Sequence, residues 1–213
     1  MKENHALKSS ALDQLEGNWG VAIAITLIAW LLTSAFTGNG SRESAEYIWE
    51  NGRWIPNSTF ASLASLVALL LNGPIEYGKS AFYLSLTNKQ EGTFSDFMSG
   101  FEQYGKTLLL HILQTIFIVL WSLLLIIPGI IAAFSYSMSY YILNDNPELT
   151  AMEAITLSKE MMSGHKLDLF LLYLSFFGWF VLGLFTLGLG FLYLAPYSNA
   201  TIANFYQEIK AEI

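Results

Sequence analysis

Residues 128–170 read PGIIAAFSYSMSYYILNDNPELTAMEAITLSKEMMSGHKLDLF and contain the unit around which the chain is organised. A Pro-Gly pair precedes a short apolar run, which an Asn-Asp-Asn-Pro sequence ends at residues 144–147. A helix capped by Thr150 follows, and a Gly-His-Lys step at 164–166 leads into the next apolar run. We interpret this stretch as a membrane helix that descends to the cytoplasm, a helix on the membrane surface, and a helix that returns.

The composition indicates a membrane protein. Hydrophobic residues make up 54% of the 213 residues and charged residues only 13%, whereas about a quarter of the residues in soluble domains are charged. The charges lie between apolar runs of about 20 residues, the length that a helix needs to cross a bilayer core of roughly 30 Å. We therefore predict an all-α polytopic membrane protein with six transmembrane helices arranged as three hairpins.

The expected elements form a single membrane domain over residues 1–213. The spans are expected at about 19–36, 58–86, 107–127, 129–144, 167–184 and 188–206. Amphipathic helices on the cytoplasmic surface are expected at about 7–16, 93–101 and 149–163. Asn72-Gly73-Pro74 should kink or break the second span, because proline removes a backbone hydrogen bond. Pro128-Gly129 should form the turn between the third and fourth spans.

A short pattern precedes each pair of spans: a capping residue, an acid three residues later, and a glycine that ends the surface helix. It occurs as Ser10/Asp13/Gly17, as Thr93/Asp96/Gly100 and as Thr150/Glu153/Gly164. Similar units at regular intervals indicate an internal repeat. We interpret the chain as three tandem repeats, each a surface helix followed by a helical hairpin.

The first outer loop contains a strong turn signal. Asn51-Gly52 suits a two-residue type I′ turn, in which both central residues need positive φ. This register places Glu50 opposite Arg53 and Trp49 opposite Trp54. We predict a small β-hairpin here, with its tryptophans near the lipid headgroups.

Lysine and arginine distinguish the two sides of the membrane. If successive loops are assigned to opposite sides of the membrane, one side has eight lysines: Lys2, Lys8, Lys79, Lys89, Lys106, Lys159, Lys166 and Lys210. The other side has only Arg42 and Arg53. Cytoplasmic loops are enriched in these residues, so we expect both termini in the cytoplasm.

Polar and ionisable side chains inside the spans are the candidate site residues, because such groups are costly at membrane depth. A polar cavity could be lined by Asn72, Glu76, Lys79, His111, Gln114 and Asn199. The same side chains could serve the structure instead. Glu76 and Lys79 would then pair at the inner interface, and the amides and His111 would bond neighbouring helices.

Several function classes lack their residues in this sequence. There is no cysteine and no HExxH motif, and no serine has a matching base, so we do not expect an enzyme. His165, Asp168 and Asp145 are too dispersed to predict a metal site, and we expect no cofactor. The net charge is −7, and without a cluster of basic residues we expect no nucleic-acid partner.

The chain resembles a known family. The stretch 128–170, with FFGW at 176–179 and FTLGLGFLYLAPY at 185–197, is similar to the bacterial integral membrane family known as domain of unknown function 975. More remotely, the Pro-Gly-Ile-Ile turn and the Ala154 to Ser158 spacing resemble the membrane domain of some glycerophosphodiester phosphodiesterases. The resemblance implies a multi-pass protein of the bacterial cytoplasmic membrane and supplies no catalytic residues.

Three functions remain open from the sequence. We expect a non-enzymatic membrane protein whose partners are membrane lipids, with a role in lipid handling or membrane homeostasis. The reason is the apolar face formed by Phe94, Phe97, Met98 and Phe101, which suits a lipid surface. The alternatives are a transporter or permease-like subunit for a small amphiphile or peptide, with Glu76 in its pathway, and an assembly partner of a membrane complex.

Overall fold

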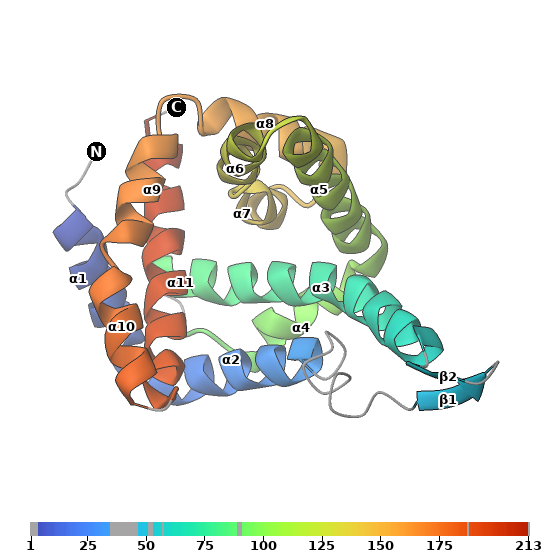
Figure 1. Cartoon of the computed structure of the whole chain (residues 1–213). Helices are drawn as coiled ribbons and strands as arrows, with labels where there is room; N and C mark the ends of the chain where they lie inside the picture. Colours follow the sequence, from blue (N-terminus) through green and yellow to red (C-terminus); the bar gives the residue numbers. More distant parts are fainter. Residues whose placement is uncertain are drawn as a thin grey trace.

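The computed structural model describes residues 4–34, 47–50, 53–56, 58–88, 91–186 and 188–212. The helices are α1 (Asn4–Leu15), α2 (Trp19–Ser34), α3 (Ser58–Thr87), α4 (Phe94–Glu102), α5 (Tyr104–Leu124), α6 (Ile126–Ser135), α7 (Ser139–Asp145), α8 (Ala151–Met161), α9 (Lys166–Leu174), α10 (Phe177–Phe185) and α11 (Leu189–Lys210). The strands are β1 (Tyr47–Glu50) and β2 (Arg53–Pro56). In Figure 1, α3 crosses the middle of the molecule, between α11 on one side and α5 on the other.

Three segments are long and apolar enough to cross a membrane: Tyr104–Leu124, Ile126–Asp145 and Lys166–Phe185. A fourth is present if α1 and α2, which meet at a bend of 99°, count as one broken span. The prediction of six spans is therefore wrong for the part of the chain that the structure describes.

Two other long helices, α3 and α11, are not among these segments, and both contain polar side chains within their sequence. In α3 these are Asn72, Glu76 and Lys79. In α11 they are Asn199, Thr201, Asn204, Gln207, Glu208 and Lys210. Residues 35–36 of the first expected span lie outside the described residues, as do Lys2, Lys89 and Arg42, on which the predicted orientation partly rests.

Close backbone contact joins α3 to α4. A Cβ placed on Gly78 would lie 2.0 Å from the carbonyl oxygen of Phe97, and one on Gly100 would lie 2.0 Å from that of Pro74. Small residues at a helix crossing allow this approach. Gly100 lies inside α4 and does not end it, so that part of the predicted repeat is wrong. Of the kink or break expected at residues 72–74, the break is wrong, since α3 is continuous through Pro74.

Two of the three predicted helix caps are present. Thr93 and Thr150 each form a capping box with the acid three residues later, Asp96 and Glu153. The third prediction is wrong, because α1 begins at Asn4 and Ser10 lies inside it. The reason is the buried stripe of Leu7, Ala11 and Leu15, which extends the helix before Ser10. Gly17 and Gly164 have φ of 82° and 95°, as expected for glycines that follow a helix.

The turn between α5 and α6 lies at Leu125, whose backbone is extended with φ −163° and ψ 151°. The predicted turn at Pro128-Gly129 is wrong, because both residues lie inside α6. Proline is tolerated in the first turn of a helix, where the N–H groups have no intrahelical acceptor. Gly129 is placed against Ser122, whose Oγ would lie 2.0 Å from a Cβ at this position.

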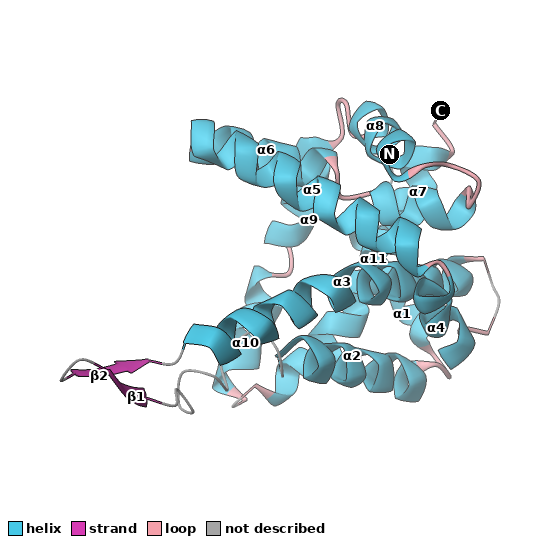
Figure 2. Ribbon diagram, turned by 90° about the vertical axis from the view of Figure 1, so that its right-hand side faces the viewer, coloured by secondary structure: helices cyan, strands magenta, loops and turns pink. Residues whose placement is uncertain are grey.

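The strands β1 and β2 pair in an antiparallel ladder. The pairs are Tyr47 with Pro56, Ile48 with Ile55, Trp49 with Trp54 and Glu50 with Arg53. Residues 51–52, on which the predicted type I′ turn falls, lie outside the described residues. Figure 2 shows the strands at one end of the molecule and helices α1, α4 and α8 toward the other.

The first and last helices pack against each other. Gln14 Nε2 donates to Asn204 Oδ1 at 2.9 Å, and Asn204 Nδ2 donates to Gln14 Oε1 at 2.7 Å. The buried stripe of α1 also contacts α11. Helix α1 is thus a fixed part of the fold.

Candidate functional site

Two of the apolar segments are broken near their middle, at residues 136–138 between α6 and α7 and at residues 175–176 between α9 and α10. A break frees backbone groups, which are costly in apolar surroundings unless they find partners. At the first break, Ser158 Oγ of α8 donates to the Ser135 carbonyl at 2.9 Å and accepts the Met138 N–H at 3.1 Å. A buried side chain from a surface helix therefore completes the broken segment.

Side chains from two further helices support these breaks. Gln114 Nε2 of α5 donates to the Tyr136 carbonyl at 2.9 Å. At the second break, Lys8 Nζ of α1 donates to the Ser175 carbonyl at 2.8 Å. The same ammonium lies 4.1 Å from the centre of the Phe176 ring, within the range of a cation–π contact. The breaks are specified features of the fold.

A polar cavity of about 110 Å³ lies between α3, α7, α9 and α11. From α3 it takes Glu76, Lys79, Ser80 and Tyr83, and from the other elements Ser137, Tyr140, Tyr141, Tyr173, Asn199 and Ile202. Most of these side chains can donate and accept hydrogen bonds. The cavity suits a small polar group.

An ion pair lies on the α3 side of the cavity. Lys79 Nζ is 2.7 Å from Glu76 Oε1, and the two residues are one helical turn apart. The side chains are 21% and 44% exposed, so water screens the pair and it adds little to stability. Its value to the site is that it offers both signs of charge to a ligand.

Tyr83 brings a buried hydroxyl to the same cavity. The residue is 1% exposed, and among the described residues its hydroxyl makes no hydrogen bond of normal geometry. Thr26 and Asn199 are the polar side chains next to it. Buried polar groups usually have partners, and Thr26 and Asn199 are the neighbours that can supply them.

The structure brings three of the six predicted site residues to the cavity: Glu76, Lys79 and Asn199. His111 does not line the cavity but contacts a residue that does, because its Nδ1 lies 2.9 Å from the Tyr140 hydroxyl. Gln114 serves the first break instead.

Asn72 precedes Glu76 by one turn of α3 and lies outside the lining of this cavity. The serines and tyrosines of the lining were not predicted. In the sequence they are only hydroxyl and phenol groups within apolar runs, as at Ser137 and Tyr173, which does not distinguish a cavity from a core.

An apolar groove of about 400 Å³ adjoins the cavity. Its lining is Tyr173, Phe176, Phe177, Phe180, Leu194 and Ser198. Tyr173 lines both spaces, and Ser198 is next in sequence to Asn199 of the cavity. A polar compartment and an apolar compartment therefore meet at one side chain.

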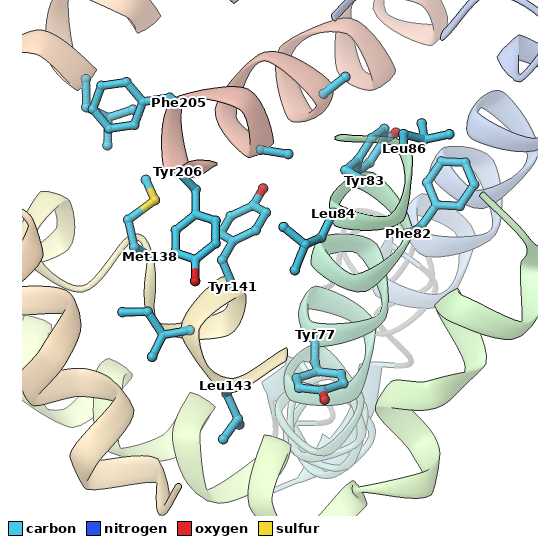
Figure 3. Packing of buried hydrophobic residues seen from close by; sticks show 14 of the residues in the cluster. Tyr77, Phe82, Tyr83, Leu84, Leu86, Met138, Tyr141, Leu143, Phe205 and Tyr206 are labelled. Atoms are coloured by element: carbon cyan, nitrogen blue, oxygen red, sulfur yellow. The ribbon is translucent and has the colours of Figure 1, made fainter. Parts of the chain in front are cut away.

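A hydrogen-bond network fixes α7 against α11 beside the cavity. Asp145 Oδ2 accepts from the Tyr206 hydroxyl at 2.6 Å and from Lys210 Nζ at 2.7 Å. The Tyr206 ring stacks on Tyr141 with centroids 5.3 Å apart (Figure 3). Because Tyr141 also lines the cavity, the network holds one of its walls.

Asp145 pairs with Lys210, whereas His165 has other acidic neighbours. His165 Nδ1 lies 3.5 Å from Asp168 Oδ2, and its Nε2 lies 3.6 Å from Glu212 Oε2. Within the described ranges, no three His, Cys, Asp or Glu side chains lie together as a metal would need.

The fold and the site define a class: a helical protein with three or four segments apolar enough to cross a membrane, and with a polar cavity between its helices. The chain belongs to the family DUF975, described as a protein of unknown function, whose family model matches residues 1–133 and 122–212. The family resemblance is thereby confirmed, while the remoter one to glycerophosphodiester phosphodiesterases stays a prediction. No curated protein and no solved structure matches this chain significantly.

Proposed function

We propose that this protein is a non-enzymatic integral membrane protein that handles lipids by binding one amphiphile across the cavity and the groove. The observation that carries the proposal is the position of Tyr173, which lines both compartments. A molecule with a polar head and an apolar tail would match a polar and an apolar space that share this side chain.

The polar compartment suits a head with both donors and acceptors. Glu76 and Lys79 offer a carboxylate and an ammonium 2.7 Å apart, and Asn199 adds an amide to the lining. A zwitterionic or hydroxyl-rich head can bind both the carboxylate and the ammonium, whereas the carboxylate of Glu76 would repel a purely anionic head. The proposed ligand is therefore a zwitterionic or neutral amphiphile.

The apolar compartment suits an acyl chain. Phe176, Phe177 and Phe180 line it from the second break and α10, and Leu194 faces them from α11. An acyl chain that enters this groove from the bilayer leaves one apolar environment for another, so packing against these side chains holds the chain in place and the polar compartment selects the head.

Membrane placement is part of the proposal and is supported by the exposed apolar surface. Around the α5–α6 turn, Leu123, Leu125 and Ile126 are 78%, 69% and 77% exposed. An exposed apolar patch of this kind is typical of a surface that meets lipid. We further propose insertion in the bacterial cytoplasmic membrane, as the family resemblance implies. The cytoplasmic placement of both termini stays a prediction, because the loops to which the lysines were assigned assumed six spans.

The test is lipid retention. Tyr173→Ala should lower the amount of co-purifying lipid severalfold, as measured by native mass spectrometry and lipid extraction. Tyr104→Ala is the matched control, because Tyr104 is similarly exposed, 38% against 44%, on a different helix. Equal lipid content in the wild type and in Tyr173→Ala would overturn the proposal.

A second candidate is transport of such an amphiphile, and the two broken segments favour it. Ser137 of the first break lines the cavity, and Phe176 of the second lines the groove. Discontinuous helices around a central site are typical of transporters. Under this candidate, reconstituted wild type should speed the movement of a fluorescent lysophospholipid between leaflets, and Glu76→Gln should slow it. Equal rates in empty vesicles would exclude transport of this probe.

A further inference from the structure

Two other apolar grooves lie side by side on the outside of α5, far along the chain from the α10–α11 hairpin. The first, of about 440 Å³, lies between α5 and α8. The second, of about 210 Å³, lies between α5, α6, the last turn of α8 and the first residue of α9. Trp121, Tyr136 and Lys159 line both, so the grooves form one forked site.

The fork has cations at one end. Lys159 lies in the last turn of α8, and Lys166 is the first residue of α9. Lys159 lines both grooves and Lys166 the second, and no carboxylate is among the residues that line either. An anionic group is therefore favoured at this end.

The two grooves share a direction. Leu124 of the first and Pro128 of the second flank the α5–α6 turn, whereas the lysines lie where α8 ends and α9 begins. From Phe117 to Leu124, the first groove follows α5 for roughly 10 Å at the usual helical rise. Both branches thus start at cations and run toward the apolar turn.

The side chains along the fork are uncovered in the isolated chain. Leu120, Trp121 and Leu124 are 53%, 46% and 68% exposed, and Ile131 in the second groove is 48% exposed. Acyl chains would cover this surface, and the aromatic ring of Trp121 would lie between them.

We propose that this fork binds one anionic diacyl phospholipid of the surrounding membrane, with its phosphate on Lys159 and Lys166 and one acyl chain in each groove. The occupant follows from charge complementarity at one end and from two apolar branches at the other. The inference is independent of the amphiphile proposed for the central cavity, since the two sites share no lining residue.

The experiment is competition between lipids on the intact protein. The wild type, incubated with equal phosphatidylglycerol and phosphatidylcholine, should retain one phosphatidylglycerol by native mass spectrometry. Lys159→Gln with Lys166→Gln should reduce this preference about tenfold or more, because each lysine near a lipid surface contributes about a factor of five. The double arginine variant should keep the preference.

Two controls isolate the site. Lys106→Gln removes the same charge outside the fork and should leave the preference unchanged. Trp121→Ala should lower retention of both lipids, because it removes the wall that the two grooves share. A folded double glutamine variant that still prefers phosphatidylglycerol would overturn the proposal. If that variant does not fold, the wild type alone decides, because a wild type without this preference would also overturn the proposal. Tyr173→Ala should retain the preference, which separates this site from the central one.

Discussion

Ser158 on α8 and Ser135 at the end of α6 are joined by a hydrogen bond of 2.9 Å, through which a surface helix closes the gap in a broken apolar segment. The same Ser158 hydroxyl accepts from the Met138 N–H, and the residue is fully buried. One side chain thus satisfies a donor and an acceptor on either side of the break.

Ser158→Ala should destabilise the protein by about 1–3 kcal/mol, because it leaves a buried carbonyl and a buried N–H without partners. Thermal unfolding in detergent, followed by circular dichroism, measures the change. Ser163→Ala, at an exposed serine just after α8, is the control and should leave the melting temperature unchanged. Equal melting temperatures for the two variants would contradict the role given to Ser158.

Gly78→Ala should prevent the close contact of α3 with α4. Its Cβ would lie 2.0 Å from a backbone carbonyl oxygen, which cannot move aside as a side chain can. We expect a loss of about 3 kcal/mol or more, or no folded protein at all. Gly105→Ala is the matched control, since nothing lies within 4 Å of its Cβ position in α5. That variant should be as stable as the wild type or slightly more stable, and a similar loss in both would refute the explanation.

Glu153 makes the start of α8 sensitive to acid. Hydrogen bonds from the Thr150 backbone and side chain hold the pKa of this carboxyl below its ordinary value of 4.5. A lowered pKa in the folded state means that the cap contributes its stability above pH 4.5 and loses it as the pH falls through the lower, folded-state pKa. Hydrogen exchange of the first turn of α8 should therefore speed up on acidification in the wild type. In Glu153→Gln the exchange rate of the same amides, corrected for the intrinsic effect of pH, should not increase in this way on acidification.

The two donors to Asp145 should differ in importance. Tyr206 is 1% exposed and its hydroxyl bonds a carboxylate, so Tyr206→Phe should cost about 1.5–3 kcal/mol. Lys210 is 46% exposed at its side chain, so Lys210→Met should cost less than about 1 kcal/mol. Denaturant unfolding of the two variants tests this order, and the reverse order would show that the ion pair dominates the network.

Local features of the fold were predictable because they depend on near neighbours. The caps at Thr93 and Thr150 need only an acid three residues later, and the sequence shows that spacing. Ser10 has the same spacing, yet a buried stripe that begins at Leu7 extends the helix past it. Pro128 was misplaced for a related reason, since proline suits the first turn of a helix as well as a turn.

The site was only half predictable. Glu76, Lys79 and Asn199 were found because charged and amide groups are conspicuous in apolar runs. Tyr83 and Tyr173 were missed, because a tyrosine in such a run looks the same whether it packs in a core or faces a cavity. That difference arises only when α3, α9 and α11 are brought together, and no local pattern encodes it.

The amide pair between Gln14 and Asn204 joins residues 190 positions apart in the chain. At translation rates of about 5–20 residues per second, the N-terminal helix leaves the ribosome roughly 10–40 s before its partner exists. During that interval Leu7, Ala11 and Leu15 have no α11 to cover them, and Lys8 has no Ser175 carbonyl to bind. Helix α1 must therefore wait for its partner, and this contact can close only after α11 has been synthesised.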